Sequence, residues 1–265
     1  MNSLSLFSGI GGLDLAAEWA GFKTVAFCEK DLFCQKVLAK HWPNVRIFDD
    51  VRNIDTSELP RLELLYGGYP CQPFSVAGRQ QGEDDDRHLW PAMFAVIKTT
   101  RPTWVVAENV KGHIALGLDD VLRDLEGAGY AARPFVIPAC AVGANHTRER
   151  VFTVAYASSD GFDDSARSAS TGTANADEAQ GEDEAGDTER CRRLRAELER
   201  RSCATWGRGI KPGIRRVVDG IPNRVDRLKS LGNAVVPQQA YPIFAAIAET
   251  YNVELRGDQQ REGKL

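Results

Sequence analysis

Short apolar runs alternate with amphipathic stretches over residues 1–157, and this alternation limits the possible folds more than any other feature of the chain. Such an alternation is typical of a parallel sheet whose two faces are covered by helices. We expect strands at residues 4–7, 24–28, 45–48, 62–66, 104–107, 134–137 and 151–155. The sequence therefore predicts an α/β fold with a doubly wound, mostly parallel seven-stranded sheet.

The segments between these runs carry helix signals. Leu13 and Ala16 lie at helical spacing before Gly21 ends the run. Asp31 is placed to cap a second helix. An apolar stripe over residues 240–251 predicts the last helix of the chain.

The composition changes after residue 157. Residues 158–189 are rich in small polar and acidic side chains and have almost no large apolar residue, so burial there cannot offset the entropy lost on ordering. We expect a main domain, a small and partly irregular appendage, a segment that returns to the main domain, and a tail, at residues 1–157, 158–214, 215–255 and 256–265.

The charge is unevenly distributed. The formal net charge of -4 does not by itself favour a polyanionic ligand. Basic residues are nevertheless concentrated from Arg190 to Lys229, so any phosphate contacts are expected in that region.

Several features favour a soluble intracellular protein. The first residues have neither the basic start nor the apolar run of a signal peptide, and no later run approaches the roughly 20 apolar residues that span a bilayer. The six cysteines form no zinc-type CxxC pair and no dense disulfide framework. We therefore expect reduced thiols and no metal.

A glycine-rich turn, Phe7 to Gly12, follows the first expected strand. Glycines let the backbone turn tightly and approach a ligand closely. Glu29, at the end of the second strand, is placed to accept hydrogen bonds from the ribose of an adenosine cofactor, and Asp50 or its neighbour Asp49 to meet the adenine amino group. NAD and S-adenosylmethionine both satisfy this pattern, and a glycine turn without a ligand is the alternative.

A cysteine stands between two prolines after the fourth expected strand, in the order Pro70, Cys71, Gln72, Pro73. A free cysteine is most often a buried space filler. Here the prolines fix φ on both sides and no apolar run surrounds the thiol, so the segment is suited to present it at the carboxyl edge of the sheet. Cys71 is therefore a candidate nucleophile.

Five short motifs make the chain similar to the cytosine-5 DNA methyltransferase family. In chain order they are Leu6 to Gly12, Pro70 to Ser75, Glu108 to Val110, Arg148 to Arg150, and Leu231 to Pro237. The resemblance implies a Rossmann-like S-adenosylmethionine-dependent methyltransferase, with residues 158–214 as a linker and reduced target-recognition region. It also implies double-stranded DNA as the substrate of a monomeric cytoplasmic enzyme, of bacterial or phage origin, that uses neither a metal nor a membrane.

The resemblance also assigns roles to individual residues. Cys71 adds as a thiolate to carbon 6 of cytosine, so that carbon 5 can attack the sulfonium methyl group. Glu108 protonates the ring nitrogen at position 3, Arg150 holds the carbonyl oxygen of the base, and Arg148 supports the loop and the developing charge. The base must leave the duplex, and residues 75–87 are expected to close on the DNA afterwards.

The expected contacts fall into two sets, of which the resemblance implies the cofactor contacts and the basic charge of residues 190–229 implies the phosphate contacts. Cofactor contacts are expected from Phe7, Gly9, Ile10, Gly12, Glu29, Asp50, Pro70, Leu89, Asn233 and Val235. DNA contacts are expected from Gln72, Ser75, Arg215, Arg216, Arg224 and Arg227. For the basic residues, a solvated surface is the alternative.

The chain departs from the family pattern in two places. His146 stands where the family usually has glutamine, and the region between the last strand and the last motif is short for a recognition domain. A tRNA methyltransferase and a non-catalytic relative are therefore alternatives, although the Cys-Phe-Thr tripeptide of the tRNA branch does not occur. An NAD-dependent oxidoreductase would leave the cysteine motif unexplained.

Overall fold

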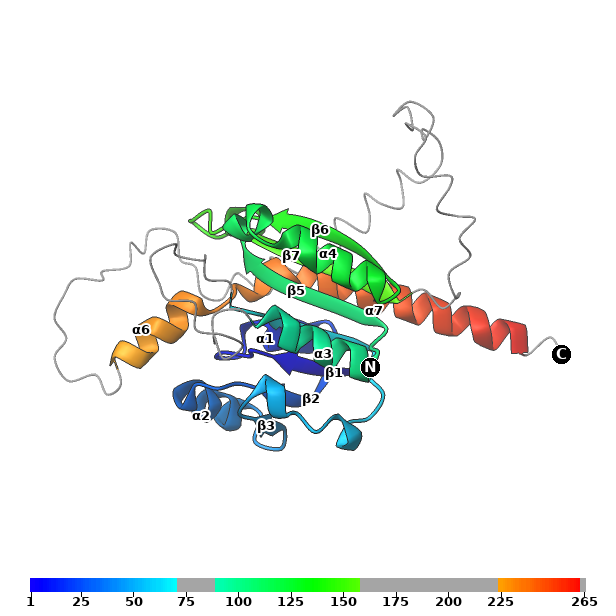
Figure 1. Ribbon diagram of the computed structural model, residues 1–265, viewed down its shortest axis with the longest axis horizontal. Coiled ribbons are helices and arrows are strands. Elements are labelled where there is room, and N and C mark those ends of the chain that lie inside the picture. The colour runs from blue at the N-terminus through cyan, green and yellow to red at the C-terminus, as the bar shows by residue number, and fades with distance from the viewer. Residues whose placement is uncertain (71–88, 158–223, 263–265) are drawn as a thin grey trace, which may run out of the picture. The chain divides into compact units, whose positions relative to one another are not determined.

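The computed structural model describes residues 1–70, 89–157 and 224–262 (Figure 1). Seven strands form one sheet in the order β3-β2-β1-β4-β5-β7-β6. Their bounds are β1 Asn2–Leu6, β2 Lys23–Cys28, β3 Arg46–Phe48, β4 Leu64–Gly68, β5 Trp104–Val110, β6 Tyr130–Ile137 and β7 Arg150–Ala157. Strands β1 to β5 are parallel, whereas β7 is antiparallel to both β5 and β6. The predicted mostly parallel sheet is confirmed.

Strand β5 is longer than the apolar run that predicted it. The run ends at Ala107, yet the strand continues through Glu108 and Asn109 to Val110. The extension arises because β7 pairs alongside, with Phe152 opposite Glu108 and Arg150 opposite Val110. Glu108 therefore belongs to a rigid strand and not to a loop after it.

Helices cover both faces of the sheet (Figure 1). They are α1 Gly12–Trp19, α2 Leu32–His41, α3 Trp90–Thr100, α4 Leu118–Gly127, α6 Arg224–Asn233 and α7 Pro237–Glu262. Asp31 caps α2 as predicted, since its Oδ1 accepts from the backbone N–H groups of Phe33 and Cys34. In the described stretches of the chain, every helix is too short or too polar to cross a membrane.

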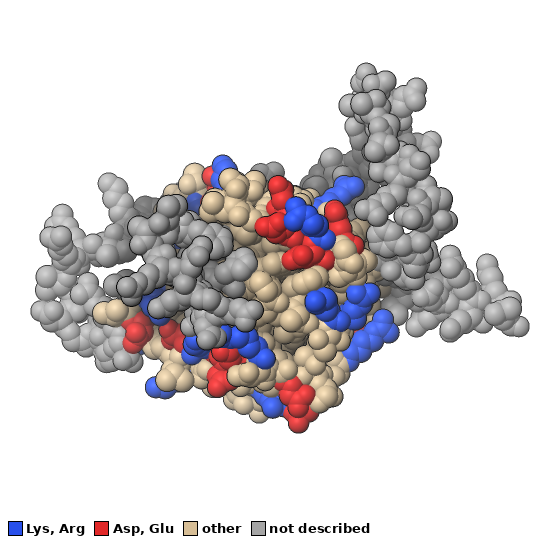
Figure 2. Space-filling view, in the orientation of Figure 1, with Lys and Arg blue, Asp and Glu red and all other residues tan. Residues whose placement is uncertain are grey.

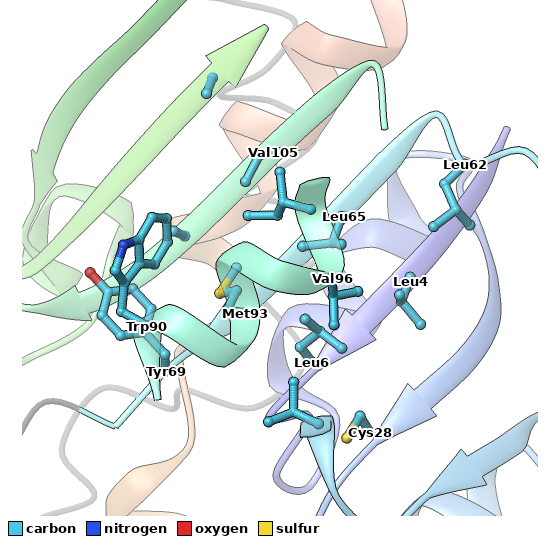
Figure 3. Packing of buried hydrophobic residues seen from close by; sticks show 14 of the residues in the cluster. Leu4, Leu6, Cys28, Leu62, Leu65, Tyr69, Trp90, Met93, Val96 and Val105 are labelled. Atoms are coloured by element: carbon cyan, nitrogen blue, oxygen red, sulfur yellow. The ribbon is translucent and has the colours of Figure 1, made fainter. Parts of the chain in front are cut away.

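The larger apolar cluster lies between the sheet and helices α3 and α4 (Figure 3). Leu65 of β4 and Val105 of β5 face Met93 and Ile97 of α3 in this cluster, and Leu125 of α4 completes it. All five are fully buried. This packing fixes α3, whose first turn lies beside the carboxyl ends of the strands.

The opposite face is covered by α1 and α7. Tyr66 of β4 contacts Phe244 of α7, with ring centroids 5.2 Å apart, and Trp19 of α1 meets Tyr241 edge-on at 6.2 Å. Residues 1–157 and 216–265 accordingly form one compact unit. The C-terminal part of the chain is thereby brought to the glycine turn at the start of α1. Helix α7 also continues past Tyr251, where the apolar stripe that predicted it ends.

A buried carboxyl group lies under this face. Asp14 is completely buried, and its Oδ1 accepts a hydrogen bond of 2.9 Å from the Tyr66 hydroxyl. Its Oδ2 has no hydrogen-bond partner within residues 1–70, 89–157 and 224–262. Burial raises the pKa of Asp14 to about 6, although hydrogen bonds from Ser5 and Tyr66 oppose the shift.

Candidate active site

The carboxyl ends of β1, β2, β4 and β5 surround a cavity of about 510 Å³. Open α/β sheets bind ligands at this edge, where the strand order changes direction. The cavity is lined by every residue predicted to contact the cofactor: Phe7, Gly9, Ile10, Gly12, Glu29, Asp50, Pro70, Leu89, Asn233 and Val235. Glu108 and Arg150 line the same cavity.

The glycine turn forms one wall. Phe7 and Gly9 both have left-handed backbones, with φ of 54° and 57°, so the chain reverses sharply after β1. The Gly9 N–H donates to Glu29 Oε2 and the Asp31 N–H donates to Glu29 Oε1, each at 2.7 Å. The Glu29 carboxylate is therefore held in place by two backbone groups at the rim of the cavity.

The segment after α6 packs directly on the start of α1. A Cβ atom on Gly12 would lie 2.6 Å from the carbonyl oxygen of Val235, closer than real contacts allow. Only glycine permits this approach at position 12. The two predicted cofactor motifs at the ends of the chain are thus in direct contact.

Helix α6 makes two further contacts across the cavity mouth. Lys229 Nζ lies 3.0 Å from Asp31 Oδ2, and the Ser230 hydroxyl lies 3.5 Å from Cys34 Sγ. The Lys229 ammonium lowers the pKa of the Asp31 carboxyl. Both contacts join α6 to the start of α2.

Asp50 lies in an ion pair at the cavity wall. Its Oδ1 and Oδ2 accept from Arg52 Nε and Nη2 at 3.0 and 3.1 Å. These bonds lower the pKa of Asp50. Asp49 lines the cavity as well, so the structure leaves both aspartates available for the role predicted for Asp50.

Glu108 and Arg150 form a buried pair on neighbouring strands. Arg150 Nε lies 2.9 Å from Glu108 Oε1. Among the described residues, no donor forms an aligned hydrogen bond to that oxygen, so the contact with Arg150 is chiefly electrostatic. Burial raises the pKa of Glu108 to about 7, against the opposing charges of Arg150 and Arg148. The other oxygen lies over Gly68, where a Cβ atom would come within 2.6 Å of it.

Arg148 is directed elsewhere. Its backbone is left-handed, with φ of 25°, and its Nη2 donates to the carbonyl oxygens of Gly232 and Ala234, each at 2.8 Å. Desolvation lowers the pKa of Arg148, and its buried Nε has no hydrogen-bond partner in the part of the chain that the structure describes. The two arginines of one motif therefore serve different places: Arg150 reaches Glu108, and Arg148 holds the backbone on both sides of Asn233.

Asn109 anchors the strand end that leads to the cysteine motif. Its Nδ2 donates to the Tyr69 carbonyl oxygen at 3.1 Å, and Asn109 is buried. The next residue, Pro70, lines the cavity. Cys71, Gln72 and Ser75 themselves lie outside the described residues.

The predicted DNA contacts fall mostly outside the described chain. Arg215 and Arg216 are not described, Arg224 is the first residue of α6, and Arg227 is exposed on that helix. On the face in Figure 2, the described lysines and arginines alternate with acidic residues and form no continuous basic surface. Among the described residues, no cluster of His, Cys, Asp and Glu is arranged to hold a metal ion.

Some cavity residues were missed by the sequence reasoning. Lys30, Cys34, Lys229 and Ser230 line the cavity, as does Asp31, which was expected only as a helix cap. The signal for Lys30 and Asp31 was their position directly after Glu29. Lys229 and Ser230 directly precede the last motif, and this adjacency was the available clue.

Curated relatives of this chain include bacterial Type II methyltransferases. M.FnuDI of Fusobacterium nucleatum is 37% identical over 161 residues, which cover 59% of this chain and 47% of the relative. M2.BsuMI of Bacillus subtilis (strain 168) is 36% identical over 167 residues, which cover 58% of this chain and 42% of the relative. The chain thus spans about half the length of the curated relatives it matches.

Solved structures show the same fold. A DNA modification methyltransferase encoded within a prophage (E. coli) matches with a TM-score of 0.50 and 24% identity, over 59% of this chain and 47% of that one. DNMT2 of Spodoptera frugiperda matches with a TM-score of 0.51 and 20% identity, over 59% of this chain and 50% of that one. The chain therefore shares its fold with these two structures.

The family model described as C-5 cytosine-specific DNA methylase matches residues 1–199 of the 265-residue chain. This range holds the glycine turn, the cysteine motif, Glu108 and both arginines. The protein belongs to the C-5 cytosine-specific DNA methylase family.

Proposed function

We propose that this protein is a DNA cytosine-5 methyltransferase that acts on a cytosine flipped out of the duplex, through a covalent bond from Cys71. The observation that carries the proposal is the buried Glu108–Arg150 pair, which shares one cavity with the glycine turn. A carboxyl group that is protonated near neutral pH beside a fixed guanidinium can bind both a ring nitrogen and a carbonyl of a base. Neither group is needed for binding a nucleotide cofactor alone.

The cavity fits S-adenosylmethionine better than a dinucleotide. The Gly9 N–H, which a dinucleotide fold aims at a diphosphate, is already hydrogen bonded to Glu29. The carboxylates of Asp31 and Asp50 in the lining are paired with Lys229 and Arg52, so these cations are not free to bind the phosphates of a dinucleotide. Glu29 would meet the ribose, with Val235 and the glycine turn on either side of the ligand. When bound, S-adenosylmethionine supplies an electrophilic methyl group.

The proposed chemistry begins at Cys71. Its thiolate forms a bond to carbon 6 of cytosine while Glu108 transfers a proton to ring nitrogen 3, which leaves carbon 5 nucleophilic. With a pKa of about 7, Glu108 holds a proton on a large fraction of molecules at neutral pH. After carbon 5 is methylated, loss of its proton to water expels the Cys71 thiolate, and return of the nitrogen 3 proton to the Glu108 carboxylate restores the neutral aromatic base.

The arginines have separate tasks in this proposal. Arg150, fixed by Glu108, donates to the carbonyl oxygen of the base and stabilises the charge that develops there. Arg148 holds the Gly232 and Ala234 carbonyls, so it acts on the cofactor side of the cavity. Asn109 fixes the Tyr69 carbonyl and thereby the start of the cysteine motif.

Transfer of a labelled methyl group from S-adenosylmethionine to duplex DNA and to tRNA tests the proposal directly. We expect incorporation into DNA, its loss in Cys71→Ala, and normal incorporation in the matched control Cys140→Ala, because Cys140 is exposed. Undiminished transfer by Cys71→Ala would refute the assigned mechanism. Incorporation into tRNA alone would make the protein an RNA methyltransferase.

Trapping on duplex DNA that contains 5-fluorocytosine separates catalysis from binding. The fluorine cannot leave as a cation after methyl transfer, so a covalent complex through Cys71 is expected to accumulate. A DNA complex without any covalent adduct would indicate a non-catalytic relative.

The proposed DNA contacts are tested by measuring how DNA affinity depends on salt concentration. If Arg215, Arg216, Arg224 and Arg227 bind phosphates, replacing each one with glutamine reduces the salt dependence of DNA affinity by roughly one unit of slope. Bisulfite sequencing of DNA from cells that express the protein then reports the methylated site.

A further inference from the structure

Two aromatic residues stand on either side of the segment that carries Cys71. Tyr69 directly follows β4 and lies two residues before Cys71 in the sequence, and Trp90 is the first residue of α3. Their ring centroids lie 5.3 Å apart at 51°, and both side chains are buried. The chain therefore enters and leaves this segment at one fixed place.

The Tyr69 hydroxyl makes a short polar contact with a second buried residue. It lies 2.6 Å from Nε2 of His113, and the two rings meet edge-on with centroids 5.4 Å apart. His113 lies in the short helical turn Lys111–Ala115, which directly follows β5. The hydrogen bond thus joins the strand that precedes Cys71 to the strand that carries Glu108.

His113 and Trp90 are themselves held in place. A Cβ atom on Gly117 would lie 2.9 Å from His113 Cε1, so the backbone packs tightly against the imidazole. Trp90 Nε1 donates to Asp124 Oδ2 on α4 at 2.7 Å. A satisfied hydrogen bond between buried partners makes the local structure more rigid and specifies one arrangement of the two groups.

We propose that Tyr69 and His113 are positioning residues, whose hydrogen bond holds the residue that leads into the cysteine motif in a fixed place relative to β5, the strand that carries Glu108. The inference rests on the proposed function. Asn109 holds the Tyr69 backbone from β5, and His113 holds its side chain from the following turn. Two contacts from one segment fix both the place and the rotation of the residue that leads into the cysteine motif.

Three substitutions separate positioning from packing. Tyr69→Phe removes only the hydroxyl, His113→Leu removes the polar partner, and His113→Gln keeps a polar group that can reach the hydroxyl. The matched control is Tyr130→Phe, because Tyr130 is equally buried and donates to the Pro102 carbonyl at 2.9 Å, at the opposite edge of the sheet.

We expect Tyr69→Phe and His113→Leu to lower kcat for DNA methylation roughly tenfold to hundredfold, since small misplacement of a reacting group has effects of this size. The Kd for S-adenosylmethionine, measured by calorimetry, is expected to stay unchanged. His113→Gln should recover much of the loss, and the double variant Tyr69→Phe with His113→Leu should be no slower than the worse single variant. Tyr130→Phe should keep the full kcat.

Unchanged kcat in Tyr69→Phe, or equal loss of kcat in Tyr69→Phe and Tyr130→Phe, would overturn the proposal and leave core packing as the role of the pair. A readout that does not need turnover is the rate at which iodoacetamide alkylates Cys71 relative to Cys140, followed by peptide mass spectrometry. We expect Tyr69→Phe to change this ratio and Tyr130→Phe to leave it unchanged. If the wild-type protein transfers no methyl group, the proposed function fails, and this ratio still tests the inference.

Discussion

Arg150 lies diagonally across from Glu108 on the neighbouring antiparallel strand, with Nε 2.9 Å from Oε1. Arg150 is directly opposite Val110, and side chains two positions apart on a strand share a face. The pairing register of β5 and β7 therefore brings the two charged groups together. Their burial raises the pKa of Glu108 to about 7 even with the guanidinium beside it.

Glu108→Gln is expected to slow methyl transfer by roughly a hundredfold or more, because an amide cannot transfer the proton that the reaction needs. The wild-type rate should fall as the pH rises through about 7, the pKa of Glu108, since the protonated form is the active one. Single-turnover rates at pH values on both sides of 7 measure both effects. A Glu108→Gln variant that keeps the same decline above neutral pH would assign that decline to another group.

Asp14→Asn is expected to stabilise the protein above pH 6. The folded-state pKa of Asp14 is about 6, above its ordinary value of 3.8, so the native state holds its proton more tightly than the unfolded state. This group's contribution is fully present below about pH 4, falls as the pH rises, and is lost above about pH 6. The asparagine keeps an acceptor for the Tyr66 hydroxyl without the buried charge.

Urea unfolding of wild type and Asp14→Asn at several pH values measures this effect. The difference in unfolding free energy, in favour of the variant, should grow between about pH 4 and pH 6. It should reach on the order of 3 kcal/mol, which corresponds to the rise in the pKa of Asp14 from 3.8 to about 6. Glu126→Gln, an exposed substitution on α4, is the control and should show no such growth. A difference that is constant with pH would show that Asp14 has the same pKa in the native and unfolded states.

The sheet could be predicted because the apolar runs of its strands are local. The end of β5 could not, because residues 108–110 become a strand only through pairing with β7, far along the chain. For the same reason the Glu108–Arg150 contact depends on a register that no local pattern shows. The glycine turn and its partner Glu29 were predicted, since both stand next to recognisable strand ends.

The sequence also could not predict that the side chains of Arg148 and Arg150 point in different directions. The two residues are close neighbours, but Arg148 has a left-handed backbone before the strand starts, whereas Arg150 is already in β7. Their side chains therefore leave the chain toward different partners. The pairing of Tyr69 with His113 depends likewise on how a helical turn folds back after β5.

Arg148→Lys is expected to weaken S-adenosylmethionine binding roughly tenfold. The guanidinium donates to two carbonyls, of Gly232 and Ala234, and an ammonium on a flexible stem cannot reproduce both bonds in that geometry. Calorimetry measures the Kd, with Arg123→Lys as control, because Arg123 pairs with Asp120 on the exposed surface of α4. Unchanged cofactor affinity combined with weaker DNA binding would place Arg148 on the substrate side instead.

Two glycine substitutions should separate cofactor binding from catalysis. Gly12→Ala places a methyl group 2.6 Å from the Val235 carbonyl oxygen, a backbone atom that cannot move cheaply. Gly68→Ala places one 2.6 Å from Glu108 Oε2. We expect Gly12→Ala to cost about 1–3 kcal/mol of stability and to abolish most cofactor binding. Gly68→Ala should retain cofactor binding but lose methyl transfer, because it displaces the acid.

Calorimetric titration with S-adenosylmethionine and the methyl-transfer assay, run on both variants, distinguish these outcomes. Gly127→Ala is the matched control, because no atom lies within 4 Å of a Cβ atom at that position near the end of α4. That variant should bind and react normally. If Gly12→Ala bound the cofactor as tightly as Gly127→Ala, the close contact between α1 and the segment after α6 would not form part of the binding site. If Gly68→Ala kept full methyl transfer, the position of the Glu108 carboxyl over Gly68 would not matter for catalysis.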